Sequence, residues 1–205
     1  MFNGQDDVRT IDLVTPCELH LLLGPVNHLL EELRKVWPDA DFWVAGCHAY
    51  IRGQDHGKLN DNGCNQLLKE DSLVHLESLI LEDHSKFASA FRAFAKVKKG
   101  CYSFIVSKSI KEDIQQFREI YLTLNRSVTP KVHIVFEHLY SFLEERAVAN
   151  NGIWKGLAMY SEQAFKAVHA DFKKRWERFK VNPDNESYDQ ALLQAVTCYN
   201  SLNIY

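Results

Sequence analysis

Residues 16–38, PCELHLLLGPVNHLLEELRKVWP, contain the clearest helical pattern in the sequence. Their apolar side chains recur every three or four residues, which is the spacing of one face of an α-helix. Because proline lacks an amide hydrogen and clashes with the preceding turn, Gly24-Pro25 predicts either a kink or two helices in near register, and Pro38 ends the segment. The apolar positions are Leu19, Leu22, Leu23, Val26, Leu29, Leu30, Leu33 and Trp37.

The same spacing predicts further helices as far as Asn125. We expect a short helix within residues 39–51 and two more that are broken near Asp71-Ser72, with a loop at residues 52–63, where turn-forming residues are dense. A stripe of Phe87, Phe91, Phe94 and Val97 predicts a helix that ends at Lys98-Lys99-Gly100, and another helix is expected over residues 109–125. The short helix within residues 39–51 is expected to bury the side chains of Phe42, Trp43, Cys47 and Tyr50.

Three helices are expected in the rest of the chain. Thr129-Pro130 supplies an N-cap and a proline at the first helical position, so a helix is expected to begin there. The next helix runs over residues 161–179, and the last over residues 187–202. The side chains expected to face inward in these two are Ala164, Val168, Phe172 and Trp176, then Ala191, Leu192, Ala195, Val196 and Tyr199.

These patterns predict a mainly α fold. We expect an irregular array of about seven to nine helices with no substantial sheet. Only Tyr102–Val106 has the composition of an extended segment. Residues 1–15 are polar and aperiodic, so the predicted organisation is a polar lead-in over residues 1–15 and a single helical domain over residues 16–205.

The composition is that of an intracellular globular protein. Hydrophobic residues make up 46% and aromatic residues 12% of the sequence, which is enough apolar surface to form a core. The net charge of −3 is too small to imply a polyanionic partner or a membrane surface through overall electrostatics, so any nucleic-acid contact must come from a local patch. Five scattered cysteines suggest a reducing compartment, and neither a membrane span nor a signal peptide is expected.

Two groups of side chains raise the question of a metal site. Cys47, His48, His56 and Cys64 are zinc-ligand types, but their spacing does not match finger patterns, and the alternative is a buried Cys47 with a loop histidine. In the helix after Pro130, His133 and His138 are five residues apart and are expected to diverge, whereas His133 and Glu137 could meet on one face. We expect structural roles for these histidines.

A cationic stretch follows in residues 171–180. Five cations stand there against two carboxylates, Asp171 and Glu177. Phe172 and Trp176 are at core spacing, which does not favour stacking on bases. The face could touch DNA phosphates, or it could be an ordinary solvated helix face. Its cations are Lys173, Lys174, Arg175, Arg178 and Lys180.

Glu162 has two interpretations. Ser161 can cap the helix, and a carboxylate in the first turn then stabilises it through the helix dipole. Alternatively, Glu162 is one of several carboxylates that hold divalent metal ions, which requires oxygen ligands converging from separate elements. Phosphate-binding glycine loops and a G-x-S-x-G motif do not occur in the sequence, which excludes those nucleotide-binding and hydrolase classes.

Four segments resemble the C-terminal part of transposase-like open reading frames of animal genomes. They are Glu18–Asn27, Thr129–His138, Tyr160–Gln163 with His169, and Tyr199–Ser201. Those open reading frames resemble distant relatives of RNase H-like (DDE) transposases, including the CACTA type. The resemblance covers the chain from about residue 16 onward.

The resemblance implies a role for Glu162 as the third metal-binding acid of a transposase, with His133 and His169 as neighbours. It also implies a preceding RNase H-like half that carries the first two acids. This chain has no strand-rich half, so the metal site is expected to be incomplete. No cofactor is then required, and Mg²⁺ or Mn²⁺ would be needed only if the site were completed.

The functional expectation is therefore the helical C-terminal portion of a transposase-derived protein, either a fragment or a stand-alone product. We expect it not to be catalytic alone, and to bind DNA, to self-associate, or to join a separate RNase H-like half. One alternative is a structural protein–protein interaction module without a nucleic-acid role. Another is a metal-dependent nuclease that uses Glu162. An intracellular location is expected, with the nucleus favoured over the cytoplasm.

Overall fold

A computed structural model describes residues 17–49, 57–160, 172–174, 176–179, 181 and 185–203. The chain divides into two compact units, residues 1–160 and residues 161–205, which are described separately below. That both belong to one domain over residues 16–205 stays a prediction, as does the polar lead-in, which lies outside the described residues.

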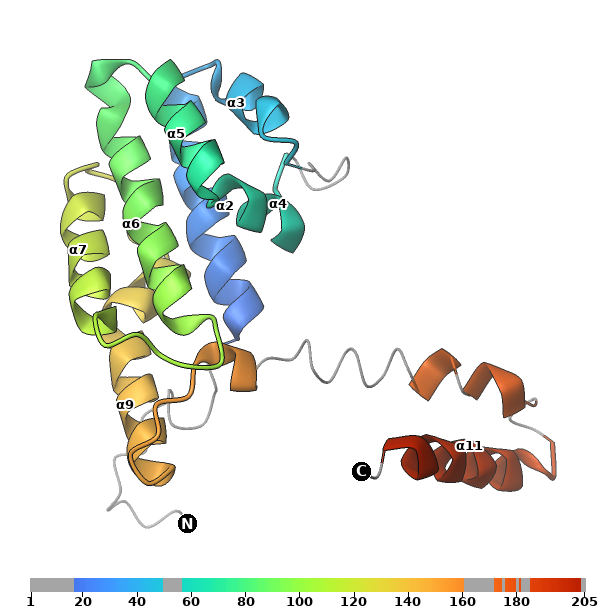
Figure 1. Ribbon diagram of the computed structural model, residues 1–205. Coiled ribbons are helices and arrows are strands. Elements are labelled where there is room, and N and C mark those ends of the chain that lie inside the picture. Colours follow the sequence, from blue (N-terminus) through green and yellow to red (C-terminus); the bar gives the residue numbers. More distant parts are fainter. Residues whose placement is uncertain are drawn as a thin grey trace, which may run out of the picture. The chain divides into compact units, whose positions relative to one another are not determined.

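The first unit is built from helices (Figure 1). Short 3₁₀ turns occur at Glu82–His84 and Leu157–Tyr160, and a π turn occurs at Ile134–His138. The described residues form no sheet, and an isolated antiparallel bridge joins Ile105 to Lys155, so the predicted mainly α fold is confirmed. The α-helices are α2 (Glu18–Val36), α3 (Ala40–Gly46), α4 (Asp61–Leu67), α5 (Glu70–Leu79), α6 (Ser85–Cys101), α7 (Ile110–Leu122), α8 (Pro130–His133) and α9 (Leu139–Ala149).

Helix α6 lies at the centre of this unit, in contact with α2, α5 and α7. Its predicted stripe of Phe87, Phe91, Phe94 and Val97 is buried. On the α7 side, the ring centre of Phe117 lies 5.1 Å from that of Phe94. Aromatic pairs at such distances contribute beyond their buried area, so this interface is a main source of stability.

Helix α2 continues through Pro25 as one helix, so the two-helix alternative is wrong. Proline removes one backbone hydrogen bond, but the apolar face of α2 is buried on both sides of it. Burial of that face outweighs the lost bond. The buried apolar residues around Pro25 are Leu21, Leu22, Val26, Leu29, Leu30 and Leu33.

Two expectations for residues 39–72 are corrected. Phe42 is 68% exposed, whereas Trp43 is fully buried with its ring edge against Phe91, because neighbouring helical positions point about 100° apart. The break between α4 and α5 lies at residues 68–69 rather than near Asp71-Ser72. Ser72 is buried within α5, where its hydroxyl donates to the Gln66 carbonyl at 2.8 Å.

The predicted loop is shorter than expected at its C-terminal end. Helix α4 already begins at Asp61, because the Asn60 side chain accepts a hydrogen bond from the Gly63 amide at 2.8 Å. Residues 50–56, and with them Tyr50 and His56, lie outside the described residues.

Residues 101–106 run beside residues 154–156 with backbone hydrogen bonds between them. The Gly156 amide donates to the Phe104 carbonyl at 3.0 Å, and the Val106 amide to the Trp154 carbonyl at 3.4 Å. A Cβ at position 156 would lie 2.8 Å from the Cys101 carbonyl oxygen and closer still to that of Ser103. Only glycine fits this close backbone approach.

The described part of the second unit contains α11 (Tyr188–Asn203) and helical residues at 172–174 and 176–179. The Trp176 ring packs edge-on against Tyr188, with ring centres 5.6 Å apart. Ala191 and Ala195 are buried as predicted, but Leu192 and Val196 are each 37% exposed, which corrects their inward assignment. Each lies about 100° around the helix from the alanine that directly precedes it.

Burial divides the five free thiols into two classes. Cys47, Cys64 and Cys101 are buried, and burial raises the pKa of each thiol, that of Cys64 to about 12. Cys17 and Cys198 are partly exposed. Because the thiolate is the reactive form, we expect only Cys17 and Cys198 to react rapidly with Ellman's reagent in native protein at about pH 8, and all five in denaturant. Rapid reaction of three or more native thiols would contradict this burial pattern.

Candidate functional site

The structure leaves the predicted acidic site untested. Glu162 and His169 lie outside the described residues, as do Arg175 and Lys180. Among the described residues, no group of three or more His, Cys, Asp or Glu side chains is placed to share a metal ion. Glu162 as a metal ligand therefore stays a prediction of the resemblance.

His133 and His138 lie together, which corrects the expectation that they diverge. Their ring centres are 5.1 Å apart and nearly perpendicular. The cause is the π turn at residues 134–138, where the Leu139 amide donates to the Ile134 carbonyl five residues earlier. In a regular α-helix, five residues would turn the two side chains roughly 140° apart. A π turn brings positions i and i+5 nearly into line.

Three other side chains that were considered as metal ligands, Glu137, Cys47 and Cys64, have partners of their own. Glu137 forms an ion pair with Arg118 of α7 at 3.1 Å. The Sγ atom of Cys47 lies 3.9 Å from the Nδ1 atom of His75. The Sγ atom of Cys64 accepts a hydrogen bond of 3.7 Å from the Nδ2 atom of Asn27. These partners favour structural roles for the side chains concerned.

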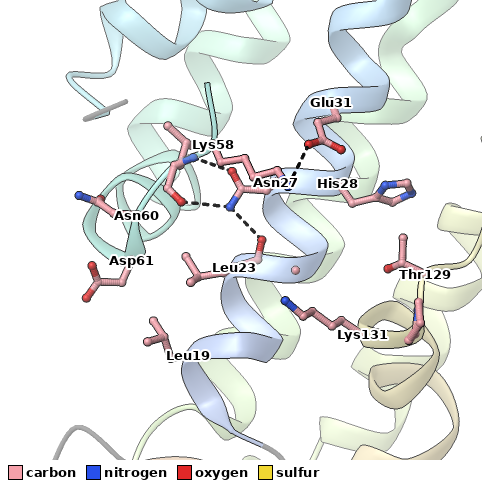
Figure 2. Close-up of a pocket in the computed structure, with 13 residues that line it drawn as sticks. Leu19, Leu23, Asn27, His28, Glu31, Lys58, Asn60, Asp61, Thr129 and Lys131 are labelled. Carbon is pink, nitrogen blue, oxygen red and sulfur yellow. Dashed lines mark hydrogen bonds and ion pairs between the residues drawn. The ribbon is translucent and has the colours of Figure 1, made fainter. Parts of the chain in front are cut away.

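A pocket of about 530 Å³ lies between α2, residues 58–61 and the start of α8 (Figure 2). It brings together Glu18–Asn27 and Thr129–His138, two of the segments that carry the resemblance, although they are far apart in the sequence. Its charged side chains are Glu31, Lys58, Asp61 and Lys131.

Asn27 holds one wall of the pocket in place. Its Nδ2 atom donates to the Leu23 carbonyl at 3.0 Å and to the Leu59 carbonyl at 3.1 Å, while its Oδ1 accepts from the Leu59 amide at 2.6 Å. Asn27 is buried, and so is Leu59. The backbone groups of Leu59 are thereby satisfied by a side chain instead of by water.

The opposite wall depends on a glycine. Lys131 lies across Gly24, and a Cβ at position 24 would overlap the Lys131 side chain and come within 2.7 Å of its Cβ. Figure 2 shows the Lys131 ammonium group reaching over α2 toward the pocket. Across the pocket, Lys58 and Glu31 approach to 3.9 Å, whereas Asp61 and Lys131 form no ion pair with any described residue. The pocket thus holds one carboxylate, that of Asp61, and one ammonium group, that of Lys131, without an ion-pair partner among the described residues.

Sequence reasoning did not single out these pocket residues. Asn27 carried a signal, because an amide on the apolar face of a helix predicts a buried hydrogen-bonding role. Lys131 carried no such signal, since Gly24, which it lies across, is more than a hundred positions away in the sequence.

The predicted cationic face is partly described. Lys173, Lys174 and Arg178 are exposed, and none of them forms an ion pair with a described residue. Phe172, Trp176 and Phe179 are half-buried on the other side of the same stretch. The aromatic residues therefore pack within the unit and leave the cations at its surface.

No protein-family model, curated protein or solved structure matches this chain. None of the described helices is both long and apolar enough to span a bilayer.

Proposed function

We propose that this chain is the helical portion of a transposase-derived protein, that it binds the DNA backbone, and that it performs no strand transfer by itself. The observation that carries the proposal is the exposed cationic face of Lys173, Lys174 and Arg178, which have no carboxylate partner among the described residues. Cations of this kind displace the counterions of DNA phosphates, which favours binding at low salt.

The arrangement of the face supports backbone contact over base stacking. Lys174 and Arg178 lie in the helical segments 172–174 and 176–179 and are four residues apart in the sequence, which is the spacing of one helix face. Trp176 packs against Tyr188 and is not available to stack on a base. Binding through such a face is expected to be strongly salt-dependent and nearly independent of DNA sequence.

Removing these charges tests the proposal. In the full chain carrying Lys173→Gln, Lys174→Gln and Arg178→Gln, we expect roughly 10- to 50-fold weaker binding of duplex DNA and a salt slope smaller by about 3, since three phosphate contacts are lost. Fluorescence polarisation over a salt series measures both quantities.

The matched control removes three other exposed lysines, Lys86, Lys108 and Lys111, and changes the net charge equally. It should reduce affinity no more than about threefold. Equal losses in the two variants would mean that only overall charge matters. Wild-type protein that binds no DNA at low salt would leave the protein-interaction module as the better interpretation.

A further inference from the structure

A second cationic surface lies in the first unit, between the start of α5 and the C-terminal half of α6. It is a hollow of about 450 Å³, called here the α5–α6 hollow. Four cations and one carboxylate line it, together with Leu68, Leu73 and Ala95. The charged residues are Glu70, Arg92, Lys96, Lys98 and Lys99.

The one carboxylate of the hollow is already engaged. Arg92 donates to Glu70 at 2.7 Å and also holds Glu77 with two hydrogen bonds of 2.7 and 2.9 Å. These bonds hold the pKa of Glu77 below its usual range, so the three groups form a fixed, charged cluster at ordinary pH. Because Arg92 is shared by two carboxylates, this cluster carries a net charge of −1, and the positive charge of the hollow comes from Lys96, Lys98 and Lys99.

The lysines of the hollow lack such partners. Lys96 donates to the neutral amide of Gln116 at 3.1 Å, and Lys99 is exposed. Neither forms an ion pair with a described residue. Lys98 is half-buried, and the pKa of its ammonium group is lowered by burial, raised by Glu18 and lowered again by Lys69. Glu18 and Lys69 thus act on Lys98 in opposite directions, the attraction by Glu18 being the larger effect.

The end of α6 explains only part of this cluster. Lys98 and Lys99 stand in its last turn, where cations suit the negative end of the helix dipole. That effect fades within one turn. It therefore does not explain why cations stand at Lys96, before the last turn of α6, or at Lys69, between α4 and α5. An incoming anion would offset the repulsion among these groups.

We infer that the α5–α6 hollow is a second DNA-backbone site, in which Lys96 and Lys99 contact phosphates of a duplex. This inference rests on the proposed DNA-binding function and extends it to the first unit. Lys96 and Lys99 are three residues apart on one face of α6, so both can meet the same strand. Duplex DNA presents a phosphate charge about every 1.7 Å along its axis, which matches a surface of closely spaced cations.

The test is the full chain carrying Lys96→Gln and Lys99→Gln, titrated into labelled duplex DNA by fluorescence polarisation. Affinity should fall roughly tenfold and the salt slope by about 2. Lys98 is left in place because its stem is half-buried. The control, Lys86→Gln with Lys108→Gln, removes two exposed charges outside the hollow and should change affinity less than about twofold.

The outcomes separate this inference from the function on which it rests. Suppose that the wild type binds DNA and that the Lys173, Lys174 and Arg178 variant binds it weakly. If the Lys96 and Lys99 variant then binds as tightly as its control, the proposed DNA site in the α5–α6 hollow is overturned and the proposed function is not. Loss of affinity in the Lys96 and Lys99 variant, with unchanged circular dichroism, supports the hollow. Absence of DNA binding by the wild type at low salt overturns both.

Discussion

Replacing Phe117 with alanine is expected to lower the free energy of unfolding by about 3–5 kcal/mol. Phe117 is fully buried, and its ring centre lies 5.1 Å from that of Phe94, 5.3 Å from that of Phe136 and 5.9 Å from that of Tyr121. The substitution leaves a cavity at the point where α6, α7 and the π turn meet. Urea denaturation followed by circular dichroism measures the loss.

Phe42→Ala is the matched control, because it removes the same atoms from a side chain that is 68% exposed. It should change the free energy of unfolding by less than about 0.5 kcal/mol. Equal effects of the two substitutions would show that the α6–α7 interface is not the core described above.

Replacing Asn27 with alanine is expected to cost about 2–4 kcal/mol and to loosen residues 57–60. The substitution leaves the amide and carbonyl of Leu59 buried without their side-chain partner. Hydrogen exchange followed by mass spectrometry should show faster exchange at Leu59, and denaturation measures the loss of stability.

Asn62→Ala serves as the comparison, since Asn62 is an exposed asparagine in the first turn of α4. It should leave exchange at Leu59 unchanged. Unaltered exchange in the Asn27 variant would mean that other contacts hold this wall of the pocket.

The helices could be predicted because each carries its own periodic pattern. The apolar stripe of α6 and the Thr129-Pro130 start of α8 are local signals, and both are confirmed. Exposure on a helix is harder to predict, because a stripe gives the centre of the buried face but not its edges. Phe42 and Leu192 lie at such edges.

The contacts between distant segments could not be predicted in this way. The spacing of His133 and His138 predicts a regular helix in which they diverge, and it gives no sign of the π turn that brings them together. Similarly, the spacing of Lys98 and Lys99 predicts only a helix end, whereas the hollow exists because α5 brings Glu70 to Arg92.

The proposed DNA binding assigns no sequence-reading role to the exposed cations of either unit. Cations on exposed helix faces without bound carboxylates position a protein on phosphates, and base identity is read by other kinds of contact. A protein of this kind would hold DNA for a partner that supplies the chemistry.

The most direct test of DNA-backbone binding is the salt dependence of affinity for a labelled duplex, measured with the wild-type full chain by fluorescence polarisation. We expect saturable binding at about 50 mM salt and a linear fall of log K with log salt concentration, with a slope of about −3 to −5 for three to five neutralised phosphates. No saturable binding at that salt concentration, or a slope near zero, would contradict the proposal.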